Sequence, residues 1–171
     1  MTWALTQYDM TPSEIVLAFS DCAPVPVDKI AEDLGIVVVY DSSLSDDVSG
    51  KIERAHGAPS GYRITVNGRH HERRRRFTLA HEIAHYMLHR DLIGDGLTDN
   101  ALYRSILRNG QEFADFREQE ANQYAASILM PARAVKTQFS SGNCSIIGIA
   151  KAFNVSPAAA EIRMRQLHLG P

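Results

Sequence analysis

Residues 77–88 carry the strongest pattern in the chain: Phe77-Thr78-Leu79-Ala80-His81-Glu82-Ile83-Ala84-His85-Tyr86-Met87-Leu88. Apolar residues recur there at intervals of three and four, which predicts a helix. The segment also contains an HExxH motif, His81-Glu82-x-x-His85. Residues four apart on a helix lie about 40° apart in rotation and about 6 Å apart along the axis. Two imidazoles at that spacing can bind one metal ion from the same face.

The competing interpretation of this motif is a solvated helix face that carries two histidines by chance. The neighbours of the motif are small or apolar, so the helix is expected to be largely buried. Buried histidines that flank a buried carboxylate need partners, and a metal ion supplies them. Glu82 projects from the edge of the same face, where its carboxylate can take a proton from a water bound to zinc. The pattern therefore predicts a catalytic zinc site with His81 and His85 as ligands and Glu82 as the general base.

A second helix is predicted over about residues 112–130, ending before Pro131, and it offers the third ligand. Its apolar stripe consists of Ala121, Ala125, Ile128 and Leu129. Glu118 lies at the centre of this stripe, whereas Glu120 lies about 160° away around the axis. A carboxylate inside an apolar stripe is costly unless it is paired or binds a metal. Glu118 is thus the favoured third ligand, with a solvent-exposed glutamate as the alternative interpretation and Glu120 as the alternative ligand.

Other polar residues near the motif have different expected roles. Asn122 shares the face of Glu118 and suits an outer contact that orients a ligand histidine. His89 lies about 12 Å along the axis from His81 and cannot share an ion with both other histidines, so a packing or capping role is expected. His70 and His71 are expected to be exposed. The run Arg73–Arg76 precedes the helix and is expected to be solvated charge with one or two buried stems.

Composition limits the class of protein. A chain of 171 residues with a net charge of -2 fits one domain, with or without a small appendage, and has no general attraction to nucleic acid or membranes. The only two cysteines, Cys22 and Cys144, form neither a disulfide framework nor a thiolate zinc site. No signal peptide and no apolar stretch of about 20 residues is seen. We therefore expect a cytoplasmic protein without a membrane partner.

The remaining pattern predicts an α+β fold, in which a small mixed or antiparallel sheet packs against the HExxH helix and the second zinc-bearing helix. Strands are predicted at residues 36–40, 49–54 and 61–67. Further helices are predicted at residues 14–19, 27–34, 101–107, 131–139, 146–153 and 157–167. Residues 91–116, between the two zinc-bearing helices, form a long insert. Its Tyr103 could serve as a donor to the oxyanion of a transition state.

The last two predicted helices form a short pair that resembles a helix-turn-helix. The second of them offers only Arg163 and Arg165 as basic contacts, so direct binding to nucleic acid is not expected, and a packing or docking role is favoured. A DNA-binding regulator remains the less favoured interpretation of this pair. We predict a metallopeptidase domain over residues 1–139 and a C-terminal helical appendage, packed on the same domain, over residues 140–171.

Three blocks of sequence resemble the ImmA/IrrE family of bacterial and phage-associated metallopeptidases. They are residues 76–85, Leu88-His89, and the segment that runs from Glu118 through Asn122 to Pro131. Weaker similarity occurs at residues 26–36 and 153–156. The resemblance thus extends from about residue 24 to the C-terminus.

The resemblance implies one catalytic zinc ion held by His81, His85 and Glu118, with Glu82 as the general base. Members of the family are typically encoded beside helix-turn-helix repressors, which they cleave or inactivate, and some act in toxin–antitoxin-like pairs. The expected function is site-specific cleavage or inactivation of such a repressor or of an antitoxin. A regulator that binds its partner through the same zinc fold without cutting it is the alternative. Iron or manganese would also suit the two-histidine, one-carboxylate set.

Overall fold

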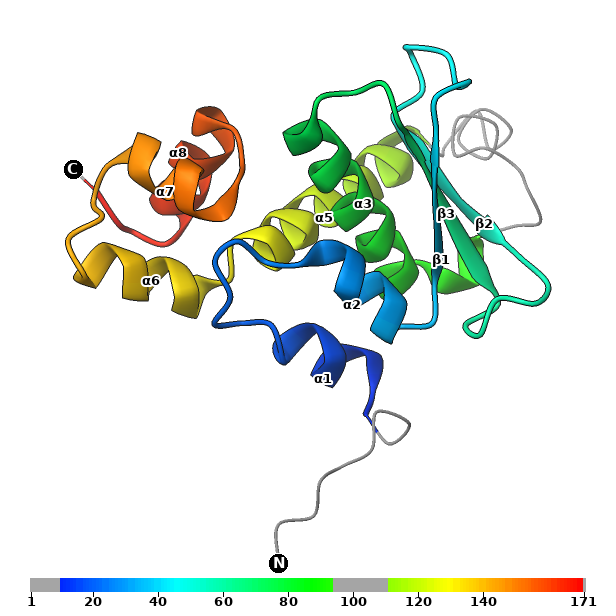
Figure 1. Cartoon of the computed structure of the whole chain (residues 1–171), viewed down its shortest axis with the longest axis horizontal. Coiled ribbons are helices and arrows are strands. Elements are labelled where there is room, and N and C mark those ends of the chain that lie inside the picture. Colours follow the sequence, from blue (N-terminus) through cyan, green and yellow to red (C-terminus); the bar gives the residue numbers. More distant parts are fainter. Residues whose placement is uncertain (1–9, 94–110, 171) are drawn as a thin grey trace, which may run out of the picture.

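The computed structural model of the protein describes residues 10–93 and 111–170, and within the helix that starts at residue 111 the side chains from residue 116 onward. Helices pack against one face of a three-stranded sheet, and further helices follow at the C-terminal end (Figure 1). The predicted α+β class is confirmed. The predicted helix at residues 101–107 and Tyr103 lie outside the described residues.

The sheet is mixed. Its strands are β1 (Val37–Asp41), β2 (Gly50–Arg54) and β3 (Tyr62–Asn67), in the order β1-β3-β2. The central strand β3 runs parallel to β1 and antiparallel to β2. Ile52 and Ile64 face each other across the β2–β3 pair, and both are buried. Their side chains belong to the same core as the HExxH helix, which packs against β2 and β3.

The HExxH helix α3 spans Glu72–Leu88 and starts five residues before the apolar pattern does. His71 caps it, with its Nδ1 accepting the N–H of Arg73 at 3.2 Å. From the sequence, the arginine run was predicted to precede the helix. In the structure the run lies inside the helix. On the buried side of the helix, Leu79, Ala80 and Ile83 are fully enclosed.

The second long helix, α5 (Gln111–Leu129), lies alongside α3 (Figure 1). Ala121 and Ala125 are fully buried on the face that was predicted to be apolar, with Ile128 and Leu129 almost so. Small residues at these positions allow the two helix backbones to approach closely. Pro131 follows the helix, as predicted, and is the N-cap of α6, which starts at Ala132, one residue later than predicted.

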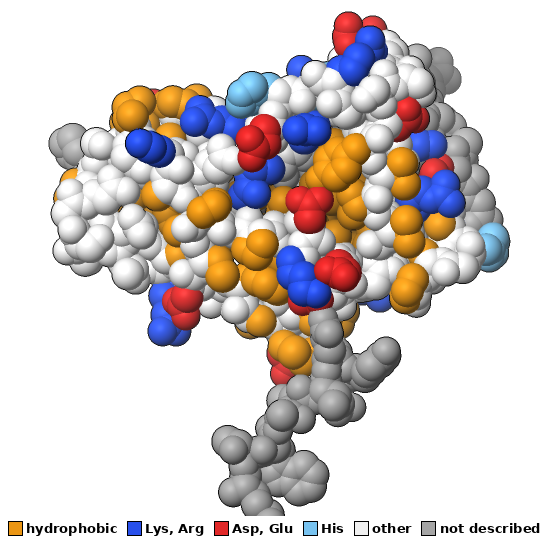
Figure 2. All heavy atoms as spheres, viewed as in Figure 1, with side chains coloured by type: hydrophobic (Ala, Val, Ile, Leu, Met, Phe, Trp, Pro, Cys, Tyr) orange, Lys and Arg blue, Asp and Glu red, His pale blue; other side chains and the backbone are white. Residues whose placement is uncertain are grey.

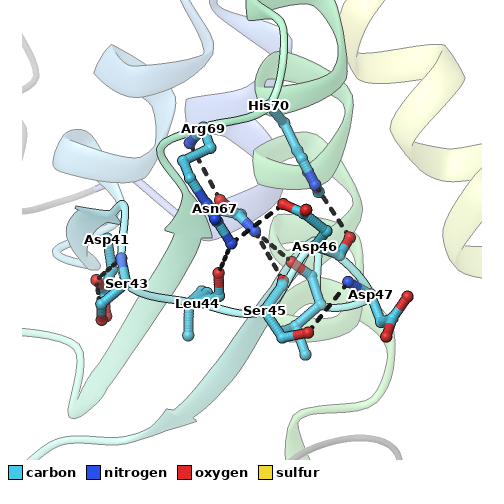
Figure 3. A network of polar contacts seen from close by, with 10 residues as sticks. Asp41, Ser43, Leu44, Ser45, Asp46, Asp47, Asn67, Arg69 and His70 are labelled. Atoms are coloured by element: carbon cyan, nitrogen blue, oxygen red, sulfur yellow. Dashed lines mark hydrogen bonds and ion pairs between the residues drawn. The ribbon is translucent and has the colours of Figure 1, made fainter.

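The loop between β1 and β2 is fixed by a polar network (Figure 3). The Asn67 side chain is fully buried, and its Nδ2 donates to the backbone oxygens of Ser45 and Val48 at 3.0 and 2.9 Å. Arg69 adds an ion pair with Asp46 at 3.1 Å. Because both backbone acceptors are satisfied by one buried amide, the start of β2 is held in a defined position beside α3.

Smaller helices complete the described part. They are α1 (Pro12–Leu17), α2 (Val27–Asp33), the 3-10 turn η2 (Arg90–Leu92), α6 (Ala132–Ser140), α7 (Ile146–Phe153) and α8 (Pro157–Gln166). No helix in residues 10–93 or 111–170 is long and apolar enough to cross a membrane.

The C-terminal pair α7–α8 shares the main hydrophobic core through residues such as Phe153, which is fully buried. Polar contacts also join the pair to the body of the protein. Asn154 donates to Glu72 at 2.7 Å, and Arg163 donates to the backbone oxygen of Met130 at 3.0 Å. The division of the chain at residue 139 stays a prediction.

Candidate metal centre

Helices α3 and α5 bring together two histidines and one glutamate. His81, His85 and Glu118 each offer one ligand atom, and these atoms lie within 4.8 Å of one another. The two Nε2 atoms are 3.0 Å apart, and each lies 3.3 Å from a carboxylate oxygen of Glu118. A tetrahedral zinc ion with bonds of about 2.0–2.1 Å requires ligand atoms about 3.3 Å apart. The donor set and its spacing therefore fit a zinc ion.

The charge of Glu118 suits this role. Burial raises the pKa of this half-buried carboxyl, but the hydrogen bonds and charges of His81 and His85 outweigh burial and hold the pKa well below its usual range. Glu118 is therefore ionised when the metal arrives. A carboxylate that is already deprotonated needs to release no proton in order to bind a cation.

The outer ring nitrogen of His81 is held by α5. His81 Nδ1 lies 3.0 Å from Asn122 Oδ1, so the ring donates its Nδ1–H to the amide oxygen and directs Nε2 toward Glu118, where a metal would bind. This is the contact expected from the position of Asn122 one turn after Glu118. The amide thus orients His81.

Removal of the Asn122 amide should weaken metal binding. We expect Asn122→Ala to lower the affinity for zinc by about tenfold, the low end of the effect of losing an outer-shell partner. Competition with a chromogenic chelator measures the change. Gln123→Ala is the matched control, because Gln123 is the exposed neighbour on the same helix. Equal affinities of the two variants would contradict the orienting role.

The outer nitrogen of His85 is held in a different way. His85 Nδ1 lies 3.1 Å from His89 Nδ1, and His89 Nε2 lies 3.4 Å from Glu120 Oε2. Burial, with the charges of His85 and Arg117, lowers the pKa of His89 in spite of the contact with Glu120, which favours the neutral ring. A neutral His89 that carries its proton on Nε2 accepts from His85 and donates to Glu120. His89 and Glu120 therefore form a chain of contacts behind His85, a role not predicted from the sequence.

Glu82 is 4% exposed and lies on the side of α3 that faces β2. The strand opposite has a glycine at residue 50, close to Thr78 and Glu82 of α3. A Cβ at Gly50 would lie 2.5 Å from Thr78 Cγ2, 2.8 Å from the Thr65 backbone oxygen and 3.7 Å from Glu82 Oε1. Gly50 thus permits the close approach of strand and helix that encloses Glu82.

A methyl group at position 50 should therefore destabilise the protein. We expect Gly50→Ala to lower the free energy of unfolding by about 1–3 kcal/mol, as overpacking of a tight contact does. In a Thr78→Ser background, which lacks the clashing Cγ2, the cost should be smaller by at least about 0.5 kcal/mol. Denaturant unfolding of the four proteins of this cycle measures both values. If the effects of the two substitutions on the free energy of unfolding are additive, a methyl group at position 50 does not clash with Thr78 Cγ2.

The remaining histidines of the basic turn take no part in this centre. His71 is exposed at the start of α3, and His70 Nε2 lies 3.3 Å from the backbone oxygen of Asp46. Both residues lie at the opposite end of the arginine run from the HExxH motif. The cluster of three potential ligands comes from α3 and α5 alone within the described residues.

An HExxH helix whose two histidines meet a glutamate from a second helix is the arrangement of zinc-dependent metallopeptidases. The chain belongs to the IrrE N-terminal-like domain family, peptidase M78, which matches residues 31–165. This family is zinc-dependent in general and is a family of peptidases, and His81, His85 and Glu118 could hold the ion. The resemblance to the ImmA/IrrE family is thereby confirmed.

The fold is similar to that of a solved structure described as a Mycobacterium tuberculosis transcriptional regulator. The TM-score is 0.59 at 18% sequence identity, and the similarity covers 90% of this chain and 45% of the regulator. The chain thus spans less than half the length of that protein. Comparison with curated proteins gave no match.

Proposed function

We propose that the protein is a zinc-dependent endopeptidase that cleaves, and so inactivates, a helix-turn-helix repressor or antitoxin in the cytoplasm. The observation that carries the proposal is the buried Glu82 next to a three-residue set that fits zinc. A purely structural metal site needs no such carboxylate. The similar structure is described as a transcriptional regulator, which agrees with a role in gene regulation.

The chemistry can be assigned to residues of the chain. His81, His85 and Glu118 would hold the metal, which when bound supplies a Lewis acid for the carbonyl and for water. Asn122 and His89 orient the two ligand rings. Glu82 accepts the proton of the attacking water and returns it to the leaving amine. Its enclosure between α3 and β2 keeps the carboxylate in one position.

The test uses the protein together with the regulator encoded beside it. The protein is stripped of metal with a chelator, reloaded with zinc, and incubated with the purified regulator, and the products are identified by mass spectrometry. We expect one or a few cuts, with zinc only. An intact regulator that co-purifies with the zinc-loaded protein would instead identify a non-cleaving partner. A DNA mobility shift by the protein alone, at physiological salt, would favour a direct DNA-binding role.

A further inference from the structure

The arginine run at the start of α3 divides into two pairs with different surroundings. Arg75 lies over the Tyr40 ring, 5.5 Å from its centroid, and Arg76 donates to the backbone oxygen of Val25 at 2.8 Å. These two arginines join α3 to the sheet and to the segment before α2. Arg73 and Arg74 line a cavity. Their side chains also make hydrogen bonds, Arg73 with Asn154 and Arg74 with Ser49 just before β2.

The cavity has a volume of about 410 Å³ and lies between the start of α3, the end of α5 and the start of α8. Its walls are largely apolar, with Phe77, Leu129, Met130 and Val155 among them, and His71, Arg73 and Arg74 stand at its basic side. This size falls within the range of ligand sites in proteins, about 300–1,000 Å³. The space can therefore take one or two large side chains.

The cavity adjoins the metal centre. Phe77 is one of its walls, and the Phe77 ring lies 6.2 Å from the His81 ring, centroid to centroid. On the opposite helix another lining residue, Ala126, follows Asn122 by one turn. Both helices thus lead from the metal ligands directly to the cavity.

The cavity has two arginine side chains, Arg73 and Arg74, on one side. Within residues 10–93 and 116–170, the side chains of Arg73 and Arg74 make hydrogen bonds with the neutral side chains of Asn154 and Ser49, at 3.4 and 2.9 Å, and Asn154 in turn donates to Glu72. In the described part of the chain, neither arginine lies within ion-pair distance of a carboxylate. Cations at a helix N-terminus are also disfavoured by the helix dipole. Figure 2 shows basic side chains and a histidine, with a few acidic ones among them, gathered near the start of α3 beside the C-terminal helices.

We infer that this cavity is a specificity site for the peptide substrate and that it takes a large apolar side chain flanked by acidic residues. The apolar walls would enclose the side chain, while Arg73 and Arg74 would pair with the neighbouring carboxylates. The inference rests on the proposed function. It adds to that function the class of peptide sequence that binds beside the metal centre.

The test measures peptide binding without cleavage. The probes are fluorescein-labelled Gly-Glu-Leu-Phe-Glu-Gly and two matched peptides, one with lysine in place of glutamate and one with alanine in place of leucine and phenylalanine. Fluorescence anisotropy gives the Kd of each for the zinc-loaded Glu82→Gln protein. We expect the acidic, apolar peptide to bind at least tenfold more tightly than either matched peptide.

Substitutions in the protein show which residues cause this binding preference. Arg73→Gln with Arg74→Gln should remove the preference for glutamate, and Ala126→Leu, which fills part of the cavity, should weaken the preference for leucine and phenylalanine. Arg133→Gln with Lys136→Gln is the matched control, because it removes the same charge from exposed positions on α6. This control should leave the binding of all three peptides unchanged.

Equal binding of the three peptides, no binding at millimolar concentration, or a preference that survives loss of Arg73 and Arg74 would overturn the inference. These results do not depend on cleavage. A protein that cuts its regulator but shows no such preference keeps the proposed function and loses this site. A protein that shows the preference but cuts nothing keeps the site as a peptide-binding surface and loses the proposed function.

Discussion

Under the proposed function, replacing Glu82 with glutamine is expected to slow cleavage of the regulator by roughly 10²–10⁴-fold while zinc stays bound, because this is the usual contribution of a general base. Glutamine has nearly the same size as glutamate, so the enclosure between α3 and β2 is preserved. It cannot accept the proton of the attacking water. The rate of regulator cleavage and the zinc content of the purified variant, from metal analysis, are the two measurements.

Glu32→Gln on α2 is the control for this experiment. Glu32 is exposed and pairs with Lys29 at 2.9 Å, so its replacement should change neither the rate nor the metal content. If Glu82→Gln cleaves the regulator as fast as the unmodified protein, Glu82 is not the base. If the variant loses its zinc as well, the loss of cleavage would reflect the metal, and the proton-transfer role would have no support.

Replacing Glu118 with glutamine is expected to lower the affinity for zinc by more than about 100-fold, beyond the 10–100-fold cost of losing an outer-shell partner. The substitution removes the negative charge that lies 3.3 Å from both histidine nitrogens. Glu120→Gln is the matched variant, because it makes the same change two residues away. Its amide oxygen can still accept from His89, so an effect of about tenfold or less is expected.

Chelator competition on both variants separates the two glutamates. A larger loss in Glu120→Gln than in Glu118→Gln would reverse the assignment of the third ligand. Equal losses would mean that both carboxylates contribute directly. Far-ultraviolet circular dichroism of each variant without metal shows whether the fold is retained.

The α+β class and most of the helices could be predicted because their signals are local. The 3.6-residue period of α3, the stop at Pro131 and the apolar stripe of α5 all depend on residues within one element. Strand order could not be predicted, since parallel pairing of β1 with β3 depends on contacts across the fold. The early start of α3 was missed because four arginines give no apolar period.

The candidate ligands could be placed from helix geometry alone. The rotation between Glu118 and Glu120 favoured Glu118, and the structure puts this residue beside the two histidines. The contact of Asn122 with His81 followed from the same geometry. These predictions needed only the assumption that the two helices face each other.

Two features needed the assembled fold. The distance of His89 from His81 along the helix axis excluded His89 as a metal ligand. However, His89 follows His85 by four residues, and this spacing could have predicted the contact between the two rings. The importance of Gly50 had no such signal. It depends on how closely one strand approaches one helix, which the sequence of neither element contains.

The two helices that supply the ligands are joined by a long stretch of chain. A metal ion held by His81, His85 and Glu118 would act as a cross-link between α3 and α5, in the way that a disulfide closes a loop. Such a site does not form in the unfolded chain, so the free energy of metal binding adds to that of folding. Free zinc at about 100 times its Kd would contribute about 2.7 kcal/mol. The concentration of free metal would therefore set the stability of the folded protein and not only its chemical activity.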